Sequence, residues 1–75
     1  MINLSQDQIS SLKSGLMPTD IPLHFQRDVD FMIKCNGSCL IAAWDNGDAD
    51  VIEEDELTEE DFADLENQTT LIRVR

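Results

Sequence analysis

The sequence predicts an α+β fold: a small three-stranded antiparallel meander plus a C-terminal strand, with an N-terminal helix and a second helix packed on the sheet, in the order α-β-β-β-α-β. Three observations predict it. A capping sequence with an apolar stripe at helical spacing opens the chain, two Asn-Gly dipeptides separate apolar runs in its middle, and a second capping sequence precedes a β-branched run near its end. With 75 residues, the chain is predicted to form a single acidic domain over residues 1–75.

The first helix is predicted to begin after Ser5. Ser5 is a favourable N-cap, and Gln8 three residues later completes a capping box. Apolar residues then recur at helical spacing, at Ile9, Leu12 and Leu16. Because Pro18 does not continue a helix, residues 17–24 are predicted to form an extended connection.

The middle of the chain is predicted to form the meander. Asn36-Gly37 and Asn46-Gly47 are typical of two-residue type I′ turns, and each lies between apolar runs. Such turns fix the register, which places Trp44 opposite Ala49. Because side chains alternate along a strand, one face is predicted to form the core, with the residues Val29, Phe31, Ile33, Leu40, Ala42, Trp44, Ala49 and Val51.

The opposite face of the meander carries a second apolar row, Met32, Ile41 and Ile52. Such a row is expected to be covered by local chain or by a partner. The same register makes Cys35 a small core residue and Cys39 a partly exposed thiol. The two sulfur atoms then point to opposite faces, which excludes a disulfide between them.

The second helix is predicted to begin near Thr58. Thr58 is placed as the N-cap, Asp61 as the capping-box acid, and the acids of residues 59–61 lie where the helix dipole favours negative charge. Only Phe62 and Leu65 give this helix an apolar side. The β-branched stretch Thr69–Val74 is predicted to be the last strand.

The charge of the chain favours cationic partners. Sixteen acids against five bases give a formal net charge of −11, while 41% hydrophobic residues are ordinary for a folded domain. A balance this negative repels nucleic acid and anionic membranes, so we expect no direct contact with either. From Asp45 to Glu66 there are 12 acids and no Lys or Arg. An exposed acidic patch is therefore predicted in this part of the chain.

No metal site is predicted. An EF-hand loop that starts at Asp45 has Gly47 and Ala49 at ligand positions, and one that starts at Asn46 has Leu57 where the bidentate Glu is needed. For zinc, the chain offers three ligands, His24, Cys35 and Cys39, where a structural site usually needs four.

No catalytic site is predicted either. His24 is the single histidine and has no evident nucleophile near it in the sequence, and general acid–base work needs a desolvated carboxylate, which a solvated acidic run does not supply. We therefore expect a protein that is not an enzyme and needs no cofactor.

The first ten residues have neither a basic start nor an apolar core of the kind found in signal peptides. The longest apolar run, Cys39–Trp44, has six residues, too few to span a membrane. We therefore expect a cytoplasmic protein, acting in a bacterial host cell.

The functional hypothesis is a non-catalytic binding protein that inhibits or masks a basic protein partner, such as a nucleic-acid-binding protein or a nuclease complex, by mimicking nucleic acid. In size, charge and lack of catalytic residues the chain resembles the small inhibitors that bacteriophages use against host defence, and the small bacterial immunity proteins that neutralise toxic nucleases. The residues predicted to bind the partner are Asp45, Asp48, Asp50, Glu53, Glu59, Glu60 and Asp64.

The alternative is a structural or assembly module. In that case the Met32/Ile41/Ile52 face forms a homodimer or docks on another subunit, and the acids only keep the protein soluble.

Overall fold

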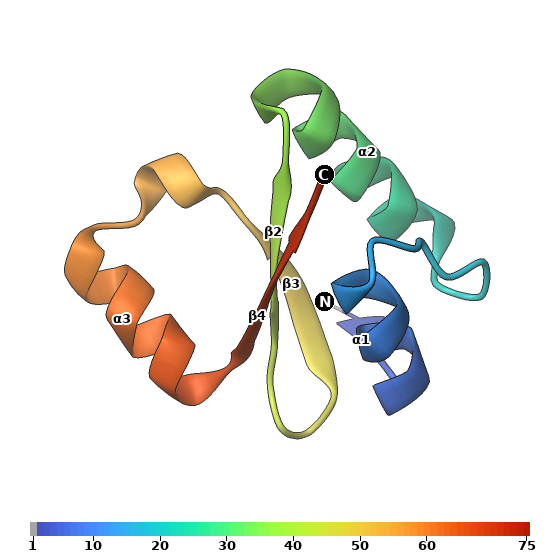
Figure 1. The fold of residues 1–75 in the computed structure, drawn as a ribbon, viewed down its shortest axis with the longest axis horizontal. Helices are drawn as coiled ribbons and strands as arrows, with labels where there is room; N and C mark the ends of the chain where they lie inside the picture. Colours follow the sequence, from blue (N-terminus) through green and yellow to red (C-terminus); the bar gives the residue numbers. More distant parts are fainter. Residues whose placement is uncertain (1) are drawn as a thin grey trace.

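The computed structural model describes residues 2–75, which fold into a four-stranded sheet, three α-helices and one 3₁₀-helix (Figure 1). The elements in chain order are β1 (Ile2–Asn3), α1 (Gln6–Lys13), α2 (Leu23–Asn36), β2 (Cys39–Ala43), β3 (Asp48–Ile52), η1 (Glu54–Glu56), α3 (Glu59–Gln68) and β4 (Thr70–Val74).

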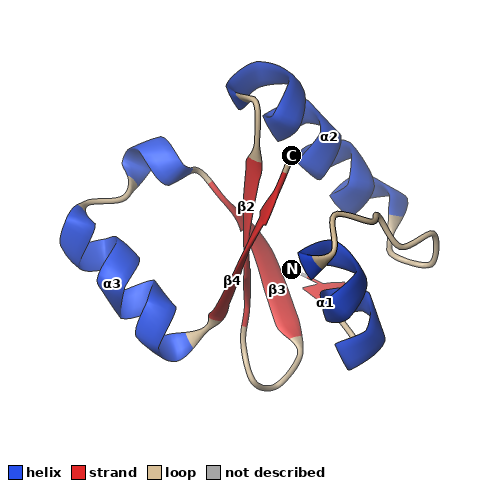
Figure 2. Cartoon of the chain, viewed as in Figure 1, coloured by secondary structure: helices blue, strands red, loops and turns tan. Residues whose placement is uncertain are grey.

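The sheet has the strand order β1-β3-β2-β4, and every neighbouring pair is antiparallel. Since β3 and β4 both run antiparallel to β2, they are parallel to each other, and the segment with η1 and α3 carries the chain from one to the other. Figure 2 shows α1 and α2 on one side of the sheet and α3 on the other. The α+β class and the four-stranded antiparallel sheet are therefore as predicted.

The main core lies between the sheet and the helices α1 and α2. On β2, alternation directs Cys39, Ile41 and Ala43 toward these helices, and all three are at most 2% exposed. The helices contribute the buried residues Ile9, Leu12, Phe25 and Val29, and the neighbouring strands contribute Ala49, Ile72 and Val74. The other face of the sheet, toward α3, is covered more thinly, because α3 contains no buried residue.

Both predicted capping boxes are present. The Ser5 side chain accepts a hydrogen bond from the backbone N–H of Gln8, whose side chain in turn accepts one from the backbone N–H of Ser5. Thr58 and Asp61 make the same pair of contacts at the start of α3. The last strand also lies within the predicted stretch.

The prediction of a strand before Asn36 is wrong, because this stretch belongs to α2. Gly37 has a φ of +82° and forms the left-handed C-cap, with its N–H donating to the carbonyl of Ile33. Asn36 does not have a positive φ, so the dipeptide is not a type I′ turn, which requires φ > 0 at both residues. The fourth strand of the sheet is supplied instead by β1 at the start of the chain.

The hairpin at Asn46-Gly47 was correctly predicted, but its register is wrong by one residue. Ala49 pairs with Ala43, where the prediction had Trp44. The loop has three residues because Gly47 has a φ of +93° and acts as the extra left-handed residue after a turn, closed by its N–H donating to the carbonyl of Trp44.

These two errors exchange the predicted faces on β2 and expose part of the predicted core, whereas Val29 and Ala49 are buried as predicted. Ile41, predicted on the outer row, is fully buried, and Phe31, predicted in the core, is 64% exposed. Cys35 and Cys39 are likewise exchanged, since Cys35 is exposed on α2 and Cys39 is buried in β2, with both thiols free. Trp44 is half-buried. A one-residue slip moves every side chain of a strand to the other face, which is the physical reason for the exchange on β2.

Candidate partner-binding surface

Negative charge is concentrated in the half of the chain that includes α3. Residues 1–38 hold four acids and three bases, whereas residues 39–75 hold 12 acids and two bases. The two bases of the second half are Arg73 and Arg75, in and after β4, so the stretch from the β2–β3 turn through α3 has none. The fold therefore places a nearly neutral pair of helices, α1 and α2, on one side of the sheet and the strongly acidic helix α3 on the other.

Two of the predicted binding residues lie at the β2–β3 turn. Asp45 is exposed, and Asp48 is half-buried at the start of β3. The Asn46 side chain donates to the Asp48 carboxylate at 3.1 Å and accepts from the Asp48 backbone N–H at 3.0 Å. The Asp48 carboxylate thus helps to hold the turn, and Asp45 is the freer of the two for a partner.

Two further predicted residues lie along and after β3 on different sides of the sheet. Asp50 is half-buried opposite Ala42, on the face toward α3. Glu53 is exposed and lies beside Phe31 of α2, in the same open hollow. The structure therefore does not bring Asp50 and Glu53 together.

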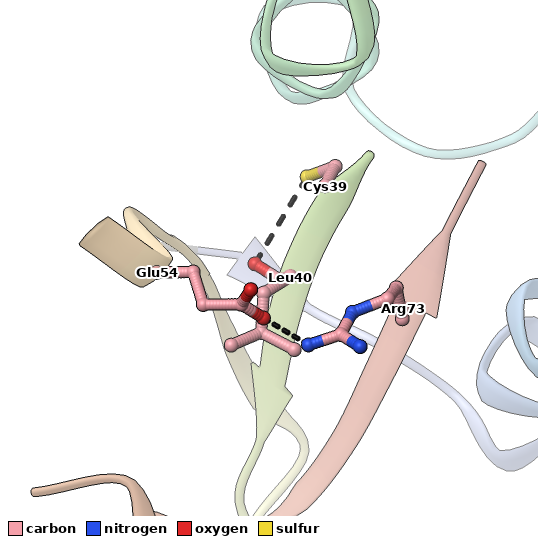
Figure 3. A network of polar contacts seen from close by, with 4 residues as sticks. All are labelled: Cys39, Leu40, Glu54 and Arg73. Carbon is pink, nitrogen blue, oxygen red and sulfur yellow. Dashed lines mark hydrogen bonds and ion pairs between the residues drawn. The ribbon is translucent and has the colours of Figure 1, made fainter. Parts of the chain in front are cut away.

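The neighbouring Glu54 forms an ion pair with Arg73, as Figure 3 shows. The register explains this contact, because Leu40 of β2 lies between Ile52 of β3 and Arg73 of β4. Glu54 is two residues beyond Ile52, so its side chain can reach over Leu40 to Arg73. Both charged groups are more than 40% exposed, so the pair contributes at most about 1 kcal/mol to folding. Its effect on the surface is to neutralise one of the acids.

The remaining predicted residues, Glu59, Glu60 and Asp64, are brought together on α3, and all are exposed. Phe62 and Leu65 are half-buried and turn one side of the helix to the sheet. Glu60 and Asp64 are four residues apart, so they share the outer side of α3. This helix carries the densest part of the acidic surface, and the β2–β3 turn lies at the end of the sheet where α3 meets β4.

A surface that the sequence analysis missed lies between α2 and the end of β3. One open hollow of about 250 Å³ is lined by Asp28, Phe31, Met32, Val51 and Glu53. A smaller hollow of about 70 Å³ shares Met32 and is lined further by Leu40, Ile52, Glu54 and others. The sequence did contain a signal for this surface, which is the helical spacing of Phe25, Val29 and Met32. In a helix with that buried side, Phe31 faces away from the core.

The predicted Met32/Ile41/Ile52 row is wrong. Ile41 is fully buried between the sheet and the helices, so it cannot contact a partner. Met32 and Ile52 do share a hollow, but Met32 comes from α2 and Ile52 from β3.

The buried thiol of Cys39 is the group whose protonation responds most clearly to the fold. Burial, with a smaller contribution from the negative charge of Asp28, raises the pKa of Cys39 from 9.0 to about 11. This thiol stays protonated and unreactive at neutral pH. Within residues 2–75, no cluster of His, Cys, Asp and Glu is arranged to hold a metal ion.

Comparison with protein-family models, with curated proteins and with solved structures gave no match. In the part of the chain that the structure describes, no helix has the length and apolar character needed to cross a lipid bilayer.

Proposed function

We propose that this protein is a non-catalytic acidic binding protein that inhibits or masks a basic, nucleic-acid-binding protein by occupying its nucleic-acid site. One observation carries the proposal: the segment from Asp45 to Glu66 holds 12 acids and no base, and every one of these acids is exposed or half-buried. The setting we propose is the bacterial cytoplasm, where a phage-type inhibitor would meet the nucleases of host defence.

The dimensions of the molecule suit mimicry of a nucleic acid. Duplex DNA carries one charge per ~1.7 Å of its axis, so 12 charges correspond to about 20 Å of duplex. The molecule measures 33 × 29 × 21 Å along its principal axes, so one side of it is long enough to present that charge. A basic groove that binds a short duplex would meet a similar number of charges over a similar length.

The composition of α3 supports a role beyond solubility. Three acids in its first turn, Glu59 to Asp61, are favoured by the helix dipole, but Asp64 and Glu66 lie in the later turns, and the last turn has no base. Glu60 and Asp64 also form a like-charge pair four residues apart, which destabilises a helix by about 0.2–0.5 kcal/mol. Local features that oppose stability are commonest at functional sites.

The mechanism we propose is competitive occupation aided by long-range attraction. Opposite charges steer the encounter of two proteins, so the association rate should be high at low salt and fall as salt screens the field. The partner should therefore be released by salt and by added duplex DNA, which competes for the same basic site.

The test is capture from a bacterial lysate with the purified protein and two charge-reversed variants. The first variant is Glu59→Lys/Glu60→Lys/Asp64→Lys, on the acidic side. The matched control, Asp7→Lys/Asp20→Lys/Asp30→Lys, makes the same change in net charge on exposed residues of the other half. Thermal unfolding of each variant verifies that it is folded.

We expect the wild-type protein and the control to retain a basic partner at low salt, and the α3 variant to lose it. Duplex DNA should release the partner from both. Equal retention by the α3 variant, or a partner that duplex DNA does not displace, would contradict the proposal.

A further inference from the structure

The outer edge of β3 is only partly covered by its neighbour β1. Among residues 2–75, β1 pairs with Asp48 and Ala49, and no described strand pairs with the outer edge of β3 at Val51, whose backbone N–H and C=O point away from β2. Exposed strand edges present backbone N–H and C=O groups that can pair with a further strand. The second half of β3 is such an edge.

Two hollows lie beside the last residues of β3, one between α2 and Val51 and the other at the end of β2 and β3. Alternation along β3 directs Val51 toward the α2 side and Ile52 toward the α3 side. Val51 lines the hollow of about 250 Å³ and Ile52 the one of about 70 Å³, and the two hollows meet at Met32. An extended segment laid along the edge would direct its alternate side chains into the two hollows, as in strand addition to an open sheet.

The larger hollow offers an apolar contact that the fold leaves incomplete. Phe31 is 64% exposed at its rim, and Met32 and Val51 are half-buried beside it. Leu16 and Leu23 have similar exposed fractions, but neither lines either of these two hollows. Phe31 is therefore the exposed apolar side chain that is placed to receive a ligand.

The acids that line the two hollows determine which kind of segment is attracted to them. Asp28 and Glu53 line the larger hollow and Asp55 lines the smaller one, where Glu54 is already paired with Arg73. No base is among the lining residues of either hollow. A second copy of the chain, with its net charge of −11, would be repelled. A segment with lysines or arginines on either side of apolar residues is attracted.

We propose that the groove between α2 and the outer edge of β3 binds an extended, basic segment of a partner protein, which pairs with β3 as an added strand and buries an apolar side chain against Phe31. The other long edge of the sheet, on β4, is bordered by none of these hollows, and β4 itself carries the exposed base Arg73. The inference does not rest on the proposed function, because it concerns α2 and β3 and makes no use of the carboxylates of α3.

The test uses a defined probe, the capped heptapeptide Lys-Lys-Val-Phe-Val-Lys-Lys, titrated into the isotope-labelled protein and followed by NMR. We expect chemical-shift changes centred on the amides of residues 50–53 and on the ring of Phe31. A control peptide with both valines N-methylated keeps the charges and side chains but lacks two backbone donors, so it should bind at least about tenfold more weakly. Equal binding of both peptides would contradict strand addition.

Phe31→Asp and Leu23→Asp form a matched pair of variants, since both replace an exposed apolar residue of α2 and add one negative charge. We expect Phe31→Asp to weaken peptide binding by about tenfold or more and Leu23→Asp to leave it near the wild-type value. Equal affinity in both variants would overturn the proposal, as would shift changes confined to α3, which indicate charge attraction alone. Sedimentation of the free protein as a dimer through the same groove would also overturn it, since the occupant would then be a second copy.

The two proposals fail independently. The variant reversed at Glu59, Glu60 and Asp64 should keep the shift pattern at residues 50–53 on adding the peptide, even where it loses a partner from lysate. Conversely, Phe31→Asp could lose the peptide and still retain a basic partner through α3.

Discussion

Both the backbone conformation of Gly47 and the atoms around it favour glycine at this position. Its φ of +93° lies in the region that L side chains rarely adopt, and a Cβ at this position would lie 2.9 Å from Asn3 Oδ1 and 3.3 Å from the Leu4 carbonyl oxygen. Its own carbonyl accepts a 2.7 Å hydrogen bond from the Leu4 N–H. The hairpin loop and the end of β1 therefore meet at a residue where a Cβ would press on the Leu4 carbonyl oxygen, while the exposed Asn3 side chain can move aside.

We expect Gly47→Ala to destabilise the fold more than Gly37→Ala. Gly37 has a similar φ of +82°, but a Cβ at this residue would have no atom within 4 Å, so its substitution should cost only the conformational strain, about 1 kcal/mol. Gly47→Ala adds a tight contact with the Leu4 carbonyl oxygen and should cost about 2 kcal/mol. Chemical denaturation of the two variants measures both values, and equal losses would show that the contact with β1 is unimportant.

The Cys39 thiol should make stability fall at alkaline pH. Its pKa is raised in the folded state from 9.0 to about 11, so between these values the unfolded chain loses a proton that the folded chain keeps. This contribution is complete below pH 9 and is lost as the pH rises toward 11, with a total of about 3 kcal/mol. Denaturant unfolding from pH 8 to 11 should show a steeper fall for the wild type than for Cys39→Ala. Cys35→Ala, at an exposed thiol, should keep the wild-type slope.

At the scale of elements, α3 is held to the rest of the molecule by few contacts. It has no buried residue, whereas all five residues of β2 are buried. Its stability depends largely on its ends, where Thr58 and Asp61 cap the first turn and the Thr69 hydroxyl donates to the Leu65 carbonyl at 2.7 Å. Elements with little buried surface open locally without unfolding of the whole domain.

We expect the amide protons of α3 to exchange with solvent well before those of β2. Thr58→Ala removes the N-cap and should lower the stability of α3 by about 1 kcal/mol, which speeds its exchange roughly fivefold while β2 is unchanged. Hydrogen exchange followed by NMR measures both elements in one sample. If α3 and β2 exchanged together in wild type and variant, α3 would belong to the same cooperative unit as the core.

In the segment that forms α2, the spacing of the apolar residues is compatible with both a strand and a helix. Val29, Phe31 and Ile33 alternate as in a strand, while Phe25, Val29 and Met32 recur as in a helix. Pro22, which stands at the N-cap, and Gly37, which forms the C-cap, fit the helix. A stretch of this length with both end signals favours a helix over a strand, and packing against β2 buries Phe25 and Val29.

At the scale of the whole molecule, the charge is unbalanced between the two sides of the sheet. The net charge of −11 opposes compaction, and the Arg73–Glu54 pair offsets little of it because both groups are exposed. Self-repulsion of this kind is screened by salt.

We therefore expect the melting temperature to rise as salt is added from low to moderate concentration. Glu60→Gln/Asp64→Asn removes two of the charges on α3 and should melt at a higher temperature in low salt, with a smaller rise on adding salt. Differential scanning calorimetry over a salt series measures this, and a melting temperature that falls with salt in the wild type would contradict the electrostatic account.

The sequence by itself determined the features that depend on neighbouring residues. The capping boxes at Ser5 and Thr58, the turn at Asn46-Gly47, the last strand and the acidic density from Asp45 to Glu66 all follow from local chemistry, and the structure contains each of them. The α+β class followed from their sum.

Only the tertiary structure decided which side of each element is buried. An Asn-Gly dipeptide fits a hairpin or a helix C-cap equally well, and a hairpin loop of two or three residues differs by one step of register. The one-residue step of register puts Ile41 in the core, and the helix in place of a strand puts Phe31 at the surface. Contacts between segments distant in the sequence make these choices, because the free energy of burying an apolar face depends on what packs against it.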